Sequence, residues 1–279
     1  MDKLSLGEQI LYSTVKIVCH AKNNTVHTSG TGFIYGACQC EKGHFSVLIT
    51  NKHVIDDIES CELTFHLQDE DGHVLNENLI YRLDGINKYT WLRHPDSKID
   101  LAMLNLSPIF EHISNSGKKV FYTCLDSTLI PNQEDVNSFS VIEDIIMLGY
   151  PNGIIDEKNN LPIVRKGITA TSYYTDFNGN KQFLADISCY PGSSGSPILV
   201  FQEGVTKNKY GNVSIGGNKL KLLGINSGVY LNTITGDLVT QKTDLIKPLL
   251  SVPNNLAIII KSEMLLDFDR ILQKFMNNN

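Results

Sequence analysis

Three serines stand close together in CYPGSSGSPIL, residues 189–199, a segment that reads as a strand interrupted by a tight polar turn. A nucleophilic serine needs an exposed position on such a turn, a base within hydrogen-bond reach and N–H donors for an oxyanion. Gly192 and Gly195 flank Ser194, and glycines let backbone N–H groups point inward because they have no Cβ. The chemistry indicated is covalent catalysis, with Ser194 as the best-placed nucleophile.

The order of residues along the chain limits which base could activate Ser194. The G-x-S-x-G pattern of α/β-hydrolases fails, because Ser196 occupies the place of its second glycine. In those enzymes the acid and the histidine also follow the serine. Here the last histidine is His112, so any histidine partner must precede Ser194.

His53 and Asp100 are the candidate base and orienting acid. His53 follows the apolar segment 45–50, so a buried strand would present it rigidly. Asp100 directly precedes the apolar residues 101–104, where a carboxylate without a partner would be costly. The structural alternatives are a surface histidine and a turn aspartate, and the apolar neighbours make the second alternative the weaker one.

Short strands dominate the sequence that must position these residues. Segments rich in Val, Ile, Tyr and Phe recur from about residue 11 to 260, which favours an all-β sandwich or barrel. The polar stretch 126–139 is typical of a linker between two β halves. Apolar residues recur at helical spacing over 262–276, so we expect a C-terminal α-helix that begins near Ser262 and docks on the β body.

Composition excludes several classes of function. The 279 residues carry a net charge of −6 with scattered Lys and Arg, so no nucleic acid is expected as a partner. No apolar run approaches 18 residues, so no membrane partner is expected. The N-terminus lacks the apolar core of a signal peptide, which favours a cytoplasmic protein with reduced cysteines. Cys38 and Cys40 have the wrong spacing for zinc, and we expect no metal and no cofactor.

Three motifs together resemble the trypsin/chymotrypsin-like serine protease family. LITNKHV resembles its histidine motif, IDLAML its aspartate motif and PGSSGSP its serine motif, in the order His–Asp–Ser. GTGFIYG (30–36) and IIMLGYPNG (145–153) are most similar to the HtrA-type and staphylococcal glutamyl-endopeptidase branch. LLGINSGVY (222–230) resembles the strand that lines the substrate cleft. The resemblance covers roughly residues 11–262 without a recognisable PDZ domain.

The resemblance implies an all-β fold of two six-stranded antiparallel β-barrels with the active site between them. An N-terminal extension and the first barrel would occupy residues 1–125, and the linker 126–139 would follow. The second barrel would occupy residues 140–261, and the C-terminal helix 262–279.

The resemblance also implies a role for each candidate residue in cleaving a protein or peptide substrate. His53 would be the general base and then the general acid, Asp100 would hold its tautomer, and Ser194 would attack the scissile carbonyl. The N–H groups of Gly192 and Ser194 would form the oxyanion hole. Ser227 matches the family serine that hydrogen-bonds the aspartate.

Specificity would lie in the S1 pocket, which holds the P1 residue immediately before the scissile bond. The resemblance places five residues in its lining: Ser188, Cys189, Ser227, Gly228 and Val229. No aspartate stands at its base, which disfavours P1 Arg or Lys. Asn226 stands where glutamyl endopeptidases have a histidine, which disfavours P1 Glu. A small to medium, uncharged P1 residue is therefore expected.

Two departures from digestive proteases bear on regulation. Ser193 stands where trypsins carry an aspartate that pairs with a newly cleaved N-terminus, so activation by N-terminal cleavage is not expected. Rearrangement of the 190–194 loop or a regulatory protein partner would then supply control. Val54 stands where digestive enzymes have a cysteine, which suits a reducing compartment. Two alternatives stay open: a catalytically silent binding module, and a polyprotein-processing protease of the same fold.

Overall fold

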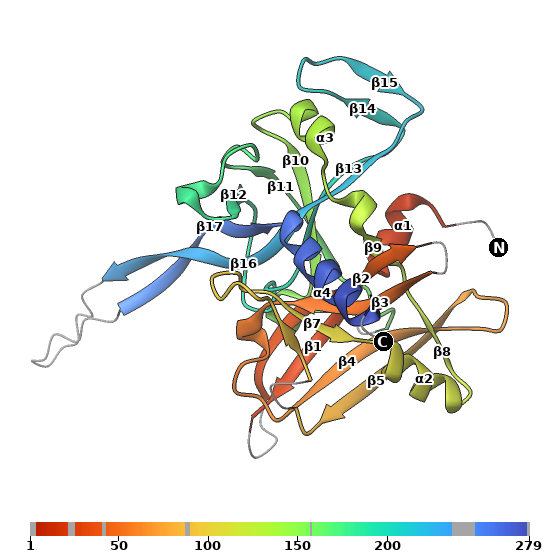
Figure 1. Cartoon of the computed structure of the whole chain (residues 1–279). Coiled ribbons are helices and arrows are strands. Elements are labelled where there is room, and N and C mark those ends of the chain that lie inside the picture. Colours follow the sequence, from red (N-terminus) through yellow and green to blue (C-terminus); the bar gives the residue numbers. More distant parts are fainter. Residues whose placement is uncertain are drawn as a thin grey trace, which may run out of the picture.

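The computed structural model describes residues 4–21, 26–40, 43–86, 90–156, 158–235 and 249–277. Mostly antiparallel strands form two assemblies, an N-terminal sheet and a C-terminal barrel, with short helices between and around them (Figure 1). The all-β class and the C-terminal helix are therefore confirmed. In the described part of the chain, no helix has both the length and the apolar character needed to cross a membrane.

The N-terminal sheet contains nine strands, and seven of them lie in the order β5-β4-β1-β2-β3-β7-β6. Two short strands join its sides, because β8 pairs with β4 and β9 pairs with β2. The strands are β1 Thr14–His20, β2 Val26–Cys40, β3 Gly43–Thr50, β4 Ser60–Gln68, β5 Val74–Asp84, β6 Leu92–Arg93, β7 Ala102–Asn105, β8 Lys119–Phe121 and β9 Leu125–Asp126. The short helices are α1 Leu6–Leu11, η1 Lys52–Val54 and α2 Ser107–Asn115.

The C-terminal assembly is a closed barrel in the order β10-β11-β12-β17-β16-β13. Its strands are β10 Asp144–Gly149, β11 Ile163–Thr169, β12 Gln182–Asp186, β13 Pro197–Gln202, β16 Lys219–Thr235 and β17 Leu249–Lys261. A separate hairpin, β14 Val205–Lys207 with β15 Val213–Ile215, projects from the barrel (Figure 1). The structure thus contains one closed six-stranded barrel, whereas the pairings described for the other half form a nine-stranded sheet.

The connection between the two assemblies is structured. Residues 126–139, expected as a linker, include η2 Ser127–Leu129 and α3 Gln133–Ser138. The Asn132 side chain caps α3 by accepting from the Asp135 amide, and the Asp135 carboxylate accepts from the Asn132 amide in turn. Two further short helices, η3 Pro151–Gly153 and η4 Phe177–Gly179, lie within the barrel half. The division of the chain into domains stays a prediction.

One of the buried apolar clusters joins the sheet to the barrel. This cluster contains Phe33 and Ile49 of the sheet, Leu148 and Leu199 of the barrel, and Phe268 of the C-terminal helix. All five residues are at most 1% exposed, and such close packing resists relative movement of the elements it joins. Side chains presented by the two assemblies are therefore held in a fixed relation.

The C-terminal helix returns from the barrel to the sheet. η5 Ser262–Leu265 leads into α4 Leu266–Asn277, which lies across β2 in Figure 1. Its buried Asp269 accepts hydrogen bonds from the Tyr35 hydroxyl (2.9 Å) and the Cys38 amide (3.0 Å). Burial raises the pKa of Asp269, while these two donors oppose the shift. The Cys38 thiol contacts the Asp269 carbonyl, and the Cys40 side chain lies outside the described residues.

Candidate active site

His53 and Asp100 emerge from neighbouring strands of the N-terminal sheet. His53 lies in η1 directly after β3, and Asp100 lies two residues before β7. β3 and β7 pair in register, with Thr50 opposite Ala102, so the loops at this end of the strands meet. Ser194 lies across from them, in the turn that leads into β13 of the barrel. The packed core between sheet and barrel thus sets the distance between these groups.

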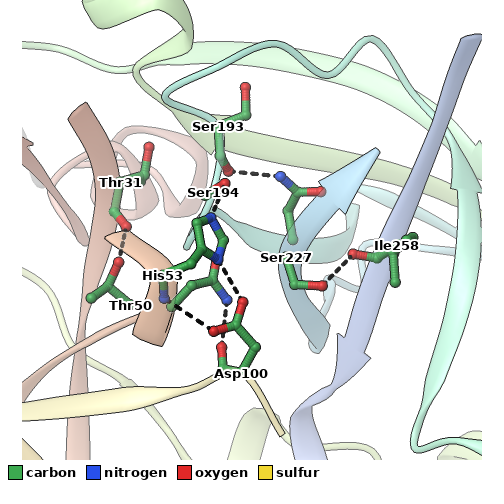
Figure 2. A network of polar contacts seen from close by, with 10 residues as sticks. Thr31, Thr50, His53, Asp100, Ser193, Ser194, Ser227 and Ile258 are labelled. Atoms are coloured by element: carbon green, nitrogen blue, oxygen red, sulfur yellow. Dashed lines mark hydrogen bonds and ion pairs between the residues drawn. The ribbon is translucent and has the colours of Figure 1, made fainter. Parts of the chain in front are cut away.

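The three predicted side chains form a continuous hydrogen-bonded chain (Figure 2). His53 Nδ1 lies 2.6 Å from Asp100 Oδ2, and His53 Nε2 lies 2.9 Å from Ser194 Oγ. The His53 amide also donates to Asp100 Oδ1 at 3.2 Å. Because an ionised carboxylate only accepts hydrogen bonds, the proton belongs on Nδ1, and Nε2 is left to accept from the serine hydroxyl.

Solvent reaches this group directly. The His53 side chain is 47% exposed and the Asp100 side chain 32%. Buried Asn51 donates from its side-chain amide to the Asp100 carbonyl at 2.7 Å, which ties the aspartate loop to the end of β3. The arrangement is open enough for a large substrate, while the backbone beneath Asp100 is held in place.

The serine turn has a conformation that only glycine satisfies at two positions. Gly192 has φ +88° and Gly195 has φ +86°, a region that L side chains rarely adopt. A Cβ on Gly195 would lie 1.9 Å from the Thr31 carbonyl oxygen. The Gly195 amide donates to the Asn226 carbonyl (2.8 Å), and the Thr31 amide donates to the Ser194 carbonyl (2.8 Å). The turn is therefore clamped between β2 and β16.

Alternate backbone amides in this turn are hydrogen-bonded within the described part of the protein, and those between them are not. The Ser193 and Gly195 amides donate to protein carbonyls, whereas those of Gly192 and Ser194 have no acceptor among the described residues. The Pro191 carbonyl accepts from the Asn152 amide at 2.5 Å. Since a trans peptide directs its N–H opposite to its C=O, this contact turns the Gly192 N–H away from Asn152. Two N–H donors of the serine turn are thus left without a partner among the described residues and are available to a ligand.

Threonines of the sheet support the same turn, although the sequence pattern predicted no role for them. The Thr31 hydroxyl donates to the Gly192 carbonyl at 2.9 Å and accepts from the Tyr150 amide at 3.1 Å. The Thr50 hydroxyl donates to the Thr31 carbonyl at 2.8 Å (Figure 2). Thr31 belongs to the GTG motif, and that motif is the signal that could have identified it.

The predicted S1 residues differ in their surroundings. Ser188 is exposed, Cys189 is buried, and Gly228 and Val229 are half-buried. A Cβ on Gly228 would meet nothing within 4 Å, so open space lies beside this strand. The Cys189 sulfur contacts the side-chain amide of Asn226 at 3.3 Å. Cys189 therefore packs into the barrel and does not present an open surface.

The role expected for Ser227 is not met in the structure. Its hydroxyl donates to the Ile258 carbonyl at 3.2 Å (Figure 2) and makes no bond to Asp100. The register of β16 against β17 shifts between Asn226 and Gly228, and such a bulge re-aims the residue within it. Ser227 thus stabilises the pairing of two barrel strands, and Asn51 supports Asp100.

Asn226, beside it, supports the serine turn and was also not assigned. Its side-chain amide donates to the Ser193 carbonyl at 2.8 Å, and its carbonyl accepts from Gly195. Asn226 is completely buried, so these bonds are shielded from competition with water. The residue expected to bear on P1 choice therefore holds the backbone on both sides of Ser194.

Comparisons with known proteins identify a protein family that this chain matches. A model of the trypsin-like peptidase domain matches residues 30–205, a span that contains His53, Asp100 and Ser194. Among curated proteins, no match was found. Similar solved structures include a serine endoprotease from Yersinia pestis, with 17% identity, TM-score 0.46, and coverage of 99% of this chain and 68% of that one.

Two further solved structures are similar to this chain. The Rv3671c protease from M. tuberculosis, in its active form, has 14% identity and TM-score 0.44, covering 92% of this chain and 78% of that one. Deg5 has 15% identity and TM-score 0.44, covering 81% of this chain and 88% of that one. Because the family model spans more than half of the sequence, the chain belongs to the trypsin-like peptidase domain family and is a serine protease.

Proposed function

We propose that the protein hydrolyses peptide bonds through a His53–Asp100–Ser194 triad and a covalent acyl-enzyme. One observation carries the proposal: the continuous hydrogen-bonded chain from Asp100 Oδ2 through both nitrogens of His53 to Ser194 Oγ. A serine hydroxyl is a weak nucleophile until an adjacent base takes its proton. His53 Nε2 lies 2.9 Å from the Ser194 hydroxyl, which is within the range needed for proton transfer and supports His53 as that base.

Acylation begins when Ser194 Oγ bonds to the scissile carbonyl carbon and its proton passes to His53 Nε2. The carbonyl electron pair moves onto oxygen, and the unbound amides of Gly192 and Ser194 donate to that oxyanion. Asp100 stabilises the imidazolium through Nδ1. When the tetrahedral intermediate collapses, the C–N bond breaks and His53 returns the proton to the leaving amine.

Deacylation repeats the sequence with water as the nucleophile. His53 Nε2 takes a proton from water while the water oxygen bonds to the acyl carbon, and the same amides hold the second oxyanion. Collapse then breaks the bond to Ser194 Oγ, and the proton on Nε2 passes to that oxygen. The free hydroxyl and the neutral imidazole are restored, so no metal or cofactor takes part in this cycle.

We also propose that activity does not require cleavage of the N-terminus. Ser193, at the position of the trypsin aspartate, is 1% exposed and already bonded within the turn. Its amide donates to the Tyr190 carbonyl, its carbonyl accepts from Asn226, and its hydroxyl accepts from the Tyr190 amide. The turn therefore needs no charged N-terminus to complete it.

We propose that the protein acts in a reducing compartment of the cell. Cys19 and Cys61 face each other across the β1–β4 pairing, and both are thiols buried in the core. Burial raises the pKa of Cys19 to about 12, which keeps it protonated and unreactive. The fold around these thiols is thus stabilised by a packed apolar core. This packing supports our proposal that the protein acts in a compartment where disulfides are absent.

A serine-reactive fluorophosphonate applied to the full chain tests the triad and the activation mode together. We expect the unprocessed protein to be labelled at one site and Ser194→Ala to remain unlabelled. Ser196→Ala is the matched control, because Ser196 lies in the same turn but its buried hydroxyl has no partner among the described residues. Labelling only after N-terminal trimming would contradict the activation proposal. No labelling under any condition would favour a silent binding module.

Thr31→Val should lower kcat by about 10- to 100-fold, because it removes the hydroxyl that orients the Gly192 carbonyl and leaves the buried Tyr150 amide without an acceptor. The same change at Thr28, on the same strand, is the control, since among the described residues that hydroxyl contacts only the neighbouring Ser29 carbonyl, at 3.5 Å. Steady-state kinetics with one peptide substrate provide the measurement. Equal kcat in both variants would show that Thr31 does not support the oxyanion hole.

A further inference from the structure

Arg165 of β11 lies against the segment that leads into the nucleophile. Its guanidinium donates to the Ser188 carbonyl at 2.8 Å and lies over the Tyr190 ring, 4.9 Å from the ring centroid. Burial raises the pKa of the Cys189 thiol, and the charge of Arg165 is among the effects that oppose this. One cation therefore borders three consecutive residues, two of which stand at the base of the predicted S1 pocket.

Arg165 lies on the less exposed of the two faces of β11. Along β11 the exposed residues are Val164, Lys166 and Ile168, whereas Arg165 and Gly167 alternate with them and are half-buried. A Cβ on Gly167 would touch Ile187, so this face of the strand packs on the 187–190 segment. The side chain is held there by the Ser188 bond and the Tyr190 ring.

Arg165 differs from the other arginines in having no acidic partner. Arg82, Arg93 and Arg270 each pair with an aspartate or glutamate. In the described part of the chain no carboxylate lies within 4.0 Å of Arg165, and one of its five N–H donors is used. A half-buried guanidinium with unused N–H donors is a preformed binding site for a carboxylate, because its planar fork can donate to both carboxylate oxygens.

We infer that Arg165 selects substrates with an acidic P1 residue, Glu or Asp. The inference rests on the proposed function and on the place of residues 188 and 189 beside the P1 side chain, which the family resemblance implies. It replaces the expectation of an uncharged P1 residue, because the pocket expected from the sequence contained no charged group. The charge comes from a strand 23 residues upstream of Ser188, outside the motifs.

Four peptides that differ only at P1, as Glu, Asp, Gln or Lys, test the inference with the full chain. We expect kcat/KM for the Glu peptide to exceed that for its isostere Gln by about 10- to 100-fold, the range of a charge-assisted hydrogen bond. Arg165→Gln should abolish this ratio, whereas Arg165→Lys should keep a smaller preference for Glu. Lys166→Gln is the control, since it removes the same charge from the exposed face of the same strand.

The outcomes separate this inference from the proposed function. Equal turnover of the Glu and Gln peptides by the wild type, or a Glu preference that survives in Arg165→Gln, would overturn the role of Arg165 while leaving Ser194-dependent cleavage intact. If Arg165→Gln lowers kcat/KM equally for all four peptides, Arg165 has a structural role, and its proposed role in P1 selection is overturned too. If Arg165→Gln does not fold, a Glu preference that is reduced in folded Arg165→Lys but unchanged in the Lys166 control still supports the role of Arg165, and an undiminished preference in Arg165→Lys overturns it. Cleavage that persists in Ser194→Ala would overturn the triad and, with it, the inference.

Discussion

Replacement of Ser194 or of His53 by alanine should each reduce kcat/KM by about four to six orders of magnitude, and the double variant should lose hardly more than either single one. The reason is that the two groups act as one unit: His53 Nε2 takes the proton of the hydroxyl that lies 2.9 Å away. Once either member is missing, the other has nothing to activate. Steady-state kinetics of the four enzymes give the comparison.

His73→Ala is the matched control for that series. His73 Nδ1 lies 3.3 Å from Asp69 Oδ2, so this histidine also pairs with an aspartate, but it does so in the turn between β4 and β5. The variant should keep the activity of the wild type. Losses that add in the double variant would show that Ser194 and His53 act independently. Retention of more than a few per cent of activity by either single variant would contradict the triad.

Chain order and strand context were sufficient to predict which side chains come together. His53 follows one apolar strand and Asp100 precedes another, and these strands pair as β3 and β7. A loop at the end of a buried strand has little freedom, so a motif located there also predicts a position in space. The glycines around Ser194 carried similar information, because positive φ at Gly192 and Gly195 defines the turn that exposes the serine.

Contacts between distant segments could not be predicted in the same way. The bond from the Thr31 hydroxyl to the Gly192 carbonyl joins residues 161 positions apart, and its existence depends on how the sheet packs on the barrel. Arg165 reaches Ser188 from the adjacent region of the barrel wall. Neither residue type by itself indicates a role in the site, because threonine and arginine are common in strands and on protein surfaces. The GTG motif singles out Thr31, but which group its hydroxyl contacts, and where Arg165 lies, depend on packing between distant segments.

Strand register was the other missing information. Ser227 has the residue type that the family pattern requires, yet the register shift between Asn226 and Gly228 turns its hydroxyl toward Ile258. The same limit applies to the N-terminal half, where the short strands β8 and β9 add to the sides of β4 and β2. A bulge or an added strand changes which side chains face each other without changing the hydrophobic pattern.

Gly195→Ala should lower kcat/KM by at least about a thousandfold, an effect on the order of losing an oxyanion donor, and should destabilise the fold by about 2–4 kcal/mol. The added Cβ would lie 1.9 Å from the Thr31 carbonyl oxygen and 2.6 Å from the Thr50 hydroxyl. Neither group can yield freely, because the two are hydrogen-bonded to each other. The turn must therefore move, and Ser194 with its amide moves with it, away from His53.

Gly204→Ala separates the contact from the backbone conformation. Gly204 has φ +76°, similar to the +86° of Gly195, but a Cβ there meets nothing within 4 Å. Both variants carry the cost of a side chain in the left-handed region, about 1–2 kcal/mol, so both should unfold at lower denaturant concentration. Only Gly195→Ala should lose activity, measured as kcat/KM on folded protein below the unfolding transition. Wild-type activity in folded Gly195→Ala would mean that the serine turn tolerates displacement, and that the clamp formed by Thr31 and Thr50 does not hold the nucleophile in place.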